Sequence, residues 1–156
     1  MSAEIRPATV ADVPALVPLV EQYWLFEDIA HFERERVGRE LSRALSDPAL
    51  MSGWIARARG EAVGYLLAVY VFSLEHLGLT AEIDEFFVLP SARGHGTGDE
   101  LLRLAEAEFH RRGCTNVFLQ IGKGNDRARV FYRDHGFDER AGFDLLDKMI
   151  PERKGR

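Results

Sequence analysis

The sequence is poor in features that mark several classes of protein. Cys114 is the single cysteine in 156 residues, so an internal disulfide is impossible and a reducing, cytoplasmic location is expected. The longest apolar run, Val63–Phe72, is about half as long as the ~20 residues that cross a bilayer. The first seven residues lack the basic stretch and apolar core of a secretory signal. These absences argue against a secreted disulfide scaffold and against a membrane partner.

The chain also lacks a surplus of basic residues. Its 20 Lys and Arg against 25 Asp and Glu give a formal charge of −5, which disfavours general binding to nucleic acid phosphates. Its five histidines show no zinc-ligand spacing and no cysteine pair accompanies them, so no metal is expected. With 46% hydrophobic residues the chain is too apolar to be disordered. One domain over residues 1–150 and a polar tail over residues 151–156 are therefore expected.

Hydrophobic periodicity predicts a sheet with helices on both faces. Strands are expected to begin at Ile5 and to cover residues 51–59, 62–72, 81–89, 116–121 and 143–150. Helices are expected over about residues 13–25, 32–45, 97–112 and 126–135, the first behind a Thr9–Asp12 capping box. The order β-α-α-β-β-β-α-β-α-β is typical of an α/β or α+β domain.

The most informative segment is a glycine-rich turn between a strand and a helix. Gly94, Gly96 and Gly98 occupy three of five positions, so the backbone can approach a ligand closely and aim its amides in one direction. The helix that begins near Thr97 adds a partial positive charge. Such a loop binds phosphate oxygens, but its spacing fits neither the P-loop nor the dinucleotide fingerprint.

Two motifs in this chain resemble signatures of the GNAT superfamily of N-acetyltransferases. Arg93, Gly96 and Gly98 match its acyl-CoA loop Arg/Gln-x-x-Gly-x-Gly/Ala, and Val88-Leu89-Pro90 matches the end of the preceding strand. The second signature is matched by Asn125, Ala128, Phe131, Tyr132, Gly136 and Phe137. The resemblance covers nearly the whole chain. It implies a single domain with a mixed, largely antiparallel sheet of about six to seven strands.

The resemblance also implies acetyl-CoA as co-substrate. Its pyrophosphate would be bound by the backbone amides of Arg93, Gly94, His95, Gly96, Thr97, Gly98 and Asp99. Its pantetheine arm would lie along Phe86, Phe87 and Val88 like an added strand, in an opening between this strand and residues 116–121, with an amide near Val88 facing the thioester oxygen. Asn125 would hydrogen-bond the pantetheine, and Ala128 is expected among the cofactor-binding residues.

An amine acceptor would need a general base. An alkyl ammonium with a pKa near 10.4 is deprotonated in only about one part in 10³ at pH 7, so its proton must be removed. Glu82, Asp84 and Glu85 lie just before the residues that would hold the thioester. Strand alternation predicts that Glu82 and Asp84 share a face with Phe86 and Val88 and that Glu85 points to the other. We rank Glu82 and Asp84 as candidate bases and Glu85 as a substrate contact; solvated strand-end charges are the alternative.

Tyr132 matches the family tyrosine and is the candidate acid that protonates the departing thiolate, although a core tyrosine is the alternative. The acceptor site is expected to include Tyr23, Phe26, Glu27 and Phe72 beside Glu85, a set suited to a small cationic amine. Three further functions are left open: a non-catalytic acyl-CoA-binding regulatory module, a protein N-terminal or lysine acetyltransferase, and another nucleotide-binding protein. Dimerisation is common in the family, and a homodimer is left open too.

Overall fold

The computed structural model describes residues 2–153 and 155, and its chain divides into two compact units, one ending at Gln120 and the other starting at Ile121. The first unit contains β1 (Glu4–Pro7), α1 (Val13–Phe26), α2 (Arg34–Leu45), β2 (Met51–Ala58), β3 (Glu61–Ser73), β4 (Gly78–Val88), α3 (Thr97–Arg111) and β5 (Asn116–Leu119). Two 3-10 turns, η1 (Val10–Asp12) and η2 (Pro90–Ala92), precede α1 and α3. The second unit contains α4 (Asp126–Asp134). Of the predicted polar tail, Lys154 and Arg156 lie outside the described residues, as does Met1.

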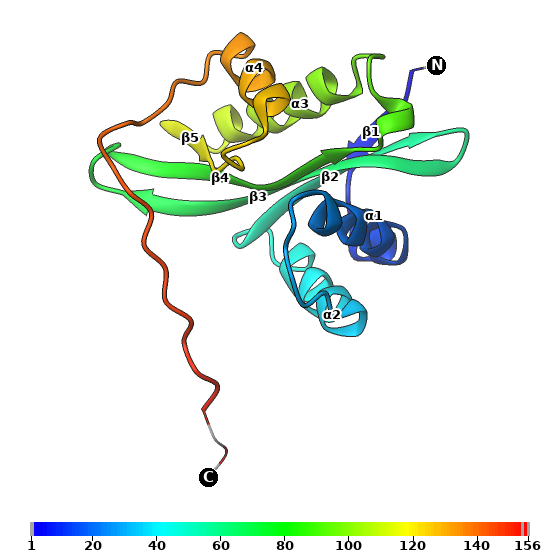
Figure 1. Ribbon diagram of the computed structural model, residues 1–156, viewed down its shortest axis with the longest axis horizontal. Coiled ribbons are helices and arrows are strands. Elements are labelled where there is room, and N and C mark those ends of the chain that lie inside the picture. Colours follow the sequence, from blue (N-terminus) through cyan, green and yellow to red (C-terminus); the bar gives the residue numbers. More distant parts are fainter. Residues whose placement is uncertain (1, 154, 156) are drawn as a thin grey trace. The chain divides into compact units, whose positions relative to one another are not determined.

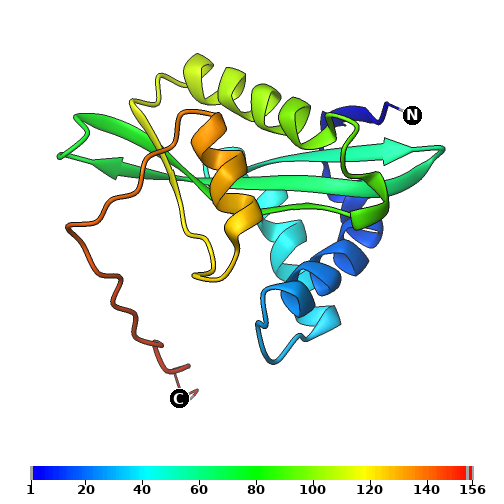
Figure 2. The same cartoon turned by 45° about the horizontal axis from the view of Figure 1, so that its top comes forward.

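The first unit is built on one mixed sheet with the order β1-β2-β3-β4-β5. Strands β1 to β4 pair antiparallel, and β4 and β5 pair parallel. Helices α1 and α2 cover one face and α3 covers the other (Figures 1 and 2). The predicted fold class is confirmed, with five strands in the described residues instead of six to seven.

The buried core follows from the apolar stripes of the helices. Val13, Leu16, Val17 and Val20 of α1 are buried against a sheet face that includes Tyr65, Leu67 and Phe87. On the opposite face, the Phe109 ring of α3 packs edge-on against Trp54 and Tyr70, with both centroids 6.2 Å away. No helix among the described residues is long and apolar enough to span a membrane.

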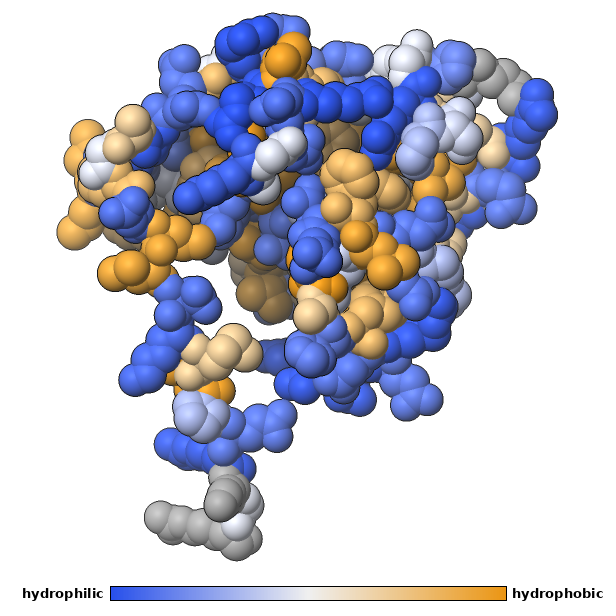
Figure 3. All heavy atoms as spheres, in the orientation of Figure 1, coloured by the Kyte–Doolittle hydropathy of each residue, from blue (hydrophilic) through white to orange (hydrophobic). Residues whose placement is uncertain are grey.

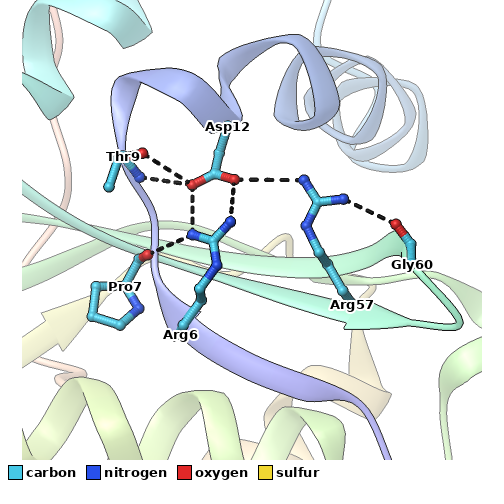
Figure 4. Close-up of polar contacts among 6 residues, drawn as sticks. All are labelled: Arg6, Pro7, Thr9, Asp12, Arg57 and Gly60. Carbon is cyan, nitrogen blue, oxygen red and sulfur yellow. Dashed lines mark hydrogen bonds and ion pairs between the residues drawn. The ribbon is translucent and has the colours of Figure 1, made fainter.

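The start of α1 is fixed by a buried carboxylate (Figure 4). Asp12 accepts hydrogen bonds from the Arg6 guanidinium at 2.6 and 2.8 Å and from the Thr9 amide at 2.8 Å, as the predicted capping box requires. Arg57 of β2 adds a longer contact of 3.5 Å. These partners lower the pKa of Asp12, the Arg6 hydrogen bond most strongly. One side chain therefore joins β1, η1 and β2.

An irregularity in β4 overturns the predicted strand alternation. Leu67 pairs with Glu85 and Ala68 with Ile83, so Asp84 is an extra residue, a β-bulge. Side chains that pair across an antiparallel ladder point to the same face. The bulge therefore places Glu82 and Glu85 on the α1 face, whereas alternation predicted Glu82 with Asp84 and Glu85 opposite.

The prediction of a last strand over residues 143–150 is wrong, because these residues form no strand in the structure. Its apolar residues do not keep the period of two, because Leu145 and Leu146 are adjacent. The segment is extended, and apolar side chains stand along it between hydrophilic ones (Figure 3). Five of them are more than two-thirds exposed: Phe143, Leu145, Leu146, Met149 and Ile150.

Candidate active site

The glycine-rich turn adopts a conformation suited to an anion. Gly94 and Gly96 have φ of +80° and +77°, and Gly96 is the N-cap of α3. A Cβ built on either glycine would meet no atom within 4 Å. The α3 ladder starts with the Glu100 N–H donating to the Gly96 carbonyl, so the Thr97 and Gly98 N–H groups precede it. The side chain of His95 is exposed, as is that of Asp99. This geometry fits a phosphate-binding turn.

Arg93 fixes the beginning of this turn. Its Nε–H donates to the Val88 carbonyl at 2.8 Å, and its guanidinium lies over the rings of Phe26 and Phe87, 5.5 and 5.6 Å from their centroids. Arg93 therefore joins the end of β4, the end of α1 and the turn, and it places a positive charge there.

The parallel ladder between β4 and β5 is short. It runs from Thr80–Asn116 to Ile83–Leu119 and stops at the Asp84 bulge. On its other side β4 stays paired with β3, through Val88 opposite Gly64. Beyond the bulge, Phe86 to Val88 thus extend past the last β5 pair, which is the arrangement predicted for the strand that flanks a pantetheine arm.

Glu85 is the most strongly perturbed acid on this strand. Its Oε1 accepts a 2.8 Å hydrogen bond from the Trp24 indole, and its Oε2 lies 3.4 Å from the Tyr65 hydroxyl. Burial and the charge of Asp84 outweigh these two hydrogen bonds and raise the pKa of Glu85 to about 7. A carboxylate with such a pKa exchanges protons near neutrality.

The other two predicted acids lie close by. Asp84 is exposed at the bulge, and partial loss of hydration raises its pKa. Burial and the charge of Asp84 also raise the pKa of Glu82, against a hydrogen bond with Gln120. All three carboxylates thus favour a proton more than they would in water.

The predicted acceptor residues are only partly brought together. The rings of Tyr23 and Phe26 lie 6.0 and 6.2 Å from that of Phe87, and the charges of Glu27, Glu85 and Asp84 all act on the Tyr23 hydroxyl. Phe72 pairs with Leu79 near the end of the β3–β4 hairpin, five residues beyond Leu67. It is exposed and follows the parity of Tyr70, on the α3 face. Phe72 therefore does not join the others.

In the second unit, the signature residues build the ends of α4. The Asn125 side chain accepts from the Ala128 amide at 3.1 Å, which makes it the predicted N-cap. Gly136, with φ of +85°, and Phe137 donate to the Arg133 and Tyr132 carbonyls in a Schellman motif. The Phe137 ring packs on Tyr132 at 5.4 Å. The catalytic role of Tyr132 stays a prediction.

Two residues of the site were missed by the sequence. Neither Trp24 nor Tyr65 is among the predicted site residues, yet both hydrogen-bond Glu85. Trp24 lies 61 positions from Glu85, so no local spacing connects them. The cluster of aromatic and acidic residues at 23–28 was the only available signal. Among the described residues, no group of His, Cys, Asp and Glu is arranged to hold a metal ion.

Comparison with known proteins converges on one family. The model of the acetyltransferase (GNAT) family matches residues 15–137. An uncharacterized N-acetyltransferase of Archaeoglobus fulgidus is 34% identical over 83% of this chain and 88% of its own. The aminoalkylphosphonate N-acetyltransferase of Salmonella typhimurium is 29% identical over 87% of this chain and 85% of its own. An integron cassette protein from the Cole Harbour Salt Marsh metagenome superposes with a TM-score of 0.82, at 28% identity over 95% of this chain and 91% of that one.

Proposed function

The chain belongs to the acetyltransferase (GNAT) family and is an N-acetyltransferase that uses acetyl-CoA; on this premise we propose that it acetylates the primary amine of a small cationic acceptor in a ternary complex. The observation that carries the proposal is Glu85, a shielded carboxylate with a pKa of about 7 on the strand that leads to the glycine turn. The site thus combines a proton acceptor with a turn suited to a pyrophosphate.

The residues present fit coenzyme A. The left-handed glycines leave open space where side chains would stand, and the Thr97 and Gly98 amides start the helix. We assign the pyrophosphate to this turn and the pantetheine to Phe86–Val88, where β5 no longer pairs. When bound, acetyl-CoA supplies the acetyl thioester. Asn125 on the second unit is assigned a pantetheine contact, with its side-chain oxygen already capping α4.

Glu85 accepts the proton of the acceptor ammonium in this mechanism. Its pKa of about 7 leaves half of the carboxylate ionised at neutrality, so it is available as a base and strong enough to act as one. Asp84 and Glu82 add negative charge that attracts the cation and raises its local concentration. Tyr132 is assigned to protonate the departing thiolate.

We infer the acceptor class from the acidic and aromatic side chains around Glu85. The charges of Glu85 and Asp84 act on Tyr23, and Phe26 adds an exposed ring at the end of the same helix, a combination suited to a cationic amine. The Salmonella relative is named for an amine acceptor of low molecular mass, which supports an acceptor of this size. We place the reaction in the cytoplasm, where a lone thiol such as Cys114 stays reduced.

The test is a panel of acceptors assayed with acetyl-CoA, in which release of the CoA thiol measures turnover. The panel contains spermidine, tobramycin, 2-aminoethylphosphonate, lysine and a peptide with a basic N-terminal residue. The proposal expects turnover with at least one of the small amines and much less with the peptide. Turnover of the peptide alone would instead identify a protein acetyltransferase. Binding of CoA without turnover of any amine would identify a non-catalytic acyl-CoA-binding module.

A further inference from the structure

A hydrogen bond connects α1 to Glu85 of β4. The Trp24 indole N–H donates to Glu85 Oε1 at 2.8 Å, a normal length for a hydrogen bond to a carboxylate. Among the described residues, the other oxygen, Oε2, has only the 3.4 Å contact with the Tyr65 hydroxyl. The two oxygens of Glu85 are therefore held unequally, and Oε2 keeps most of its capacity to accept a proton.

The indole is itself held in place. Its ring meets Phe32 edge-on at 5.4 Å, and Trp24 packs against the buried core cluster of the first unit. The Trp24 carbonyl accepts from the Ile29 amide at 2.8 Å, which fixes the end of α1. The direction of the N–H thus depends on α1 and on the core beneath it, while the Phe32 ring adds packing at the side of the indole.

The chemistry of tryptophan makes this bond one-sided. An indole N–H donates and never accepts, so it favours the ionised carboxylate over the protonated acid. A tyrosine hydroxyl, by contrast, can rotate to accept when the acid is protonated. Trp24 therefore opposes the burial that disfavours charge on Glu85.

We propose that Trp24 is a positioning residue for the transfer reaction: its indole N–H fixes Oε1 of Glu85 and stabilises the carboxylate, so that Oε2 is presented to the acceptor ammonium. The inference rests on the proposed function in assigning the ammonium to Glu85. The contact between Trp24 and Glu85 does not depend on that assignment.

The titratable groups that act on Glu85 come from three elements. Asp84 on β4 repels its charge, Tyr65 on β3 hydrogen-bonds it, and Tyr23 on α1 feels its charge. Neither tyrosine ionises near neutrality, because burial raises the pKa of both. A transition near pH 7 in this region is therefore assigned to Glu85, whose pKa is about 7.

The first test uses the indole N–H as a probe and needs no acceptor. The chain has two tryptophans, Trp24 and Trp54, so a proton–nitrogen NMR spectrum shows two indole peaks, which Trp24→Phe assigns. We expect the Trp24 peak to shift with a midpoint near pH 7, and we expect the shift to vanish in Glu85→Gln, which keeps the acceptor oxygen. A Trp24 peak that does not titrate, or that titrates unchanged in Glu85→Gln, overturns the proposal.

The second test separates positioning from packing. In Trp24→Phe the loss of the donor should raise the pKa of Glu85 by about one unit, so kcat/KM relative to wild type falls about tenfold near pH 6 and hardly at all near pH 9. Phe32→Leu is the matched control, because it removes the ring beside Trp24 and leaves the donor. It should lower Tm without moving the pH profile. An equal loss at every pH in Trp24→Phe would show a merely structural role.

The two tests also distinguish failure of the inference from failure of the proposed function. If no amine of the panel is acetylated and the Trp24 peak still titrates with Glu85, the acceptor assignment fails. The hydrogen bond between Trp24 and the Glu85 carboxylate is then still supported. If amines are acetylated and Trp24→Phe leaves the pH profile in place, the enzyme stands and the role of Trp24 fails.

Discussion

At the scale of single residues, the environment of Glu85 is what makes it the proposed base among the acids of β4. It is shielded by α1 and β3, whereas Asp84 is open to solvent at the bulge. Shielding favours the neutral acid and the two hydrogen bonds favour the anion. The opposing effects leave Glu85 with the pKa a base needs at neutral pH, which is a property of its neighbours and not of glutamate itself.

We predict that Glu85→Gln lowers kcat/KM by about 100-fold or more at pH 7, the usual loss when a general base is removed. The amide has the same shape and still accepts from Trp24, so folding should be kept. Glu82→Gln and Asp84→Asn, measured with the same acceptor, rank the three acids. A smaller loss in Glu85→Gln than in Asp84→Asn would transfer the role of base to Asp84.

Tyr132→Phe should lower kcat by about tenfold or more with little change in the affinity for acetyl-CoA, because the ring is kept and only the proton donor is lost. The contact between Tyr132 and Phe137 should survive, so Tm should not move. Steady-state kinetics and calorimetry with CoA measure the two effects. An unchanged kcat would remove Tyr132 from the mechanism.

At the scale of elements, the turn before α3 depends on left-handed backbone. Gly96→Ala should cost about 1 kcal/mol of stability, because its φ of +77° disfavours a Cβ even with open space around it. It should also weaken the binding of CoA at least about tenfold, which corresponds to the free energy of one charge-assisted hydrogen bond. Gly60→Ala in the β2–β3 turn, with φ of +81° and equal space, should show the same stability cost and normal CoA binding. Equal CoA binding in both variants would contradict the assignment.

The Asp12 cluster predicts acid sensitivity at the junction of β1 and α1. Because the pKa of Asp12 is lowered in the folded state, its contribution is present above the unfolded value near 4 and is lost as pH falls below it. Asp12→Asn should cost about 2 kcal/mol, less than the ~3–5 of a fully buried pair because the Arg6 side chain is 45% exposed. Urea unfolding measures this loss. Glu40→Gln, which breaks an exposed pair with Arg43, serves as the control and should change little.

At the scale of the whole molecule, the formal charge of −5 should steer cationic acceptors. For spermidine we expect kcat/KM to fall several-fold between about 20 and about 300 mM NaCl, because salt screens long-range attraction. 2-Aminoethylphosphonate, which carries its own negative charge, should show a weaker dependence. Equal salt dependence for the two acceptors would show that long-range charge does not select the acceptor.

The sequence by itself determined the family and the helices and strands up to α4. The helices α1 and α3 follow from apolar stripes, and the caps at Asn125 and Gly136 follow from local backbone chemistry. The two signatures identified the enzyme class because each is a short, contiguous pattern. Such features depend on residues within a few positions of one another, so they can be read along the chain.

Only the tertiary structure decided which acids and aromatics meet. The bulge at Asp84 is visible only in the pairing with β3, and it moves Glu85 to the face of Glu82. Trp24 reaches Glu85 across 61 positions, and Phe72 is separated from Tyr23 by the sheet. The strand predicted over residues 143–150 is wrong for a local reason and a tertiary one: its apolar residues lack a period of two, and among the described residues no strand pairs with it. Register and burial depend on residues far apart in the chain, and no local pattern specifies them.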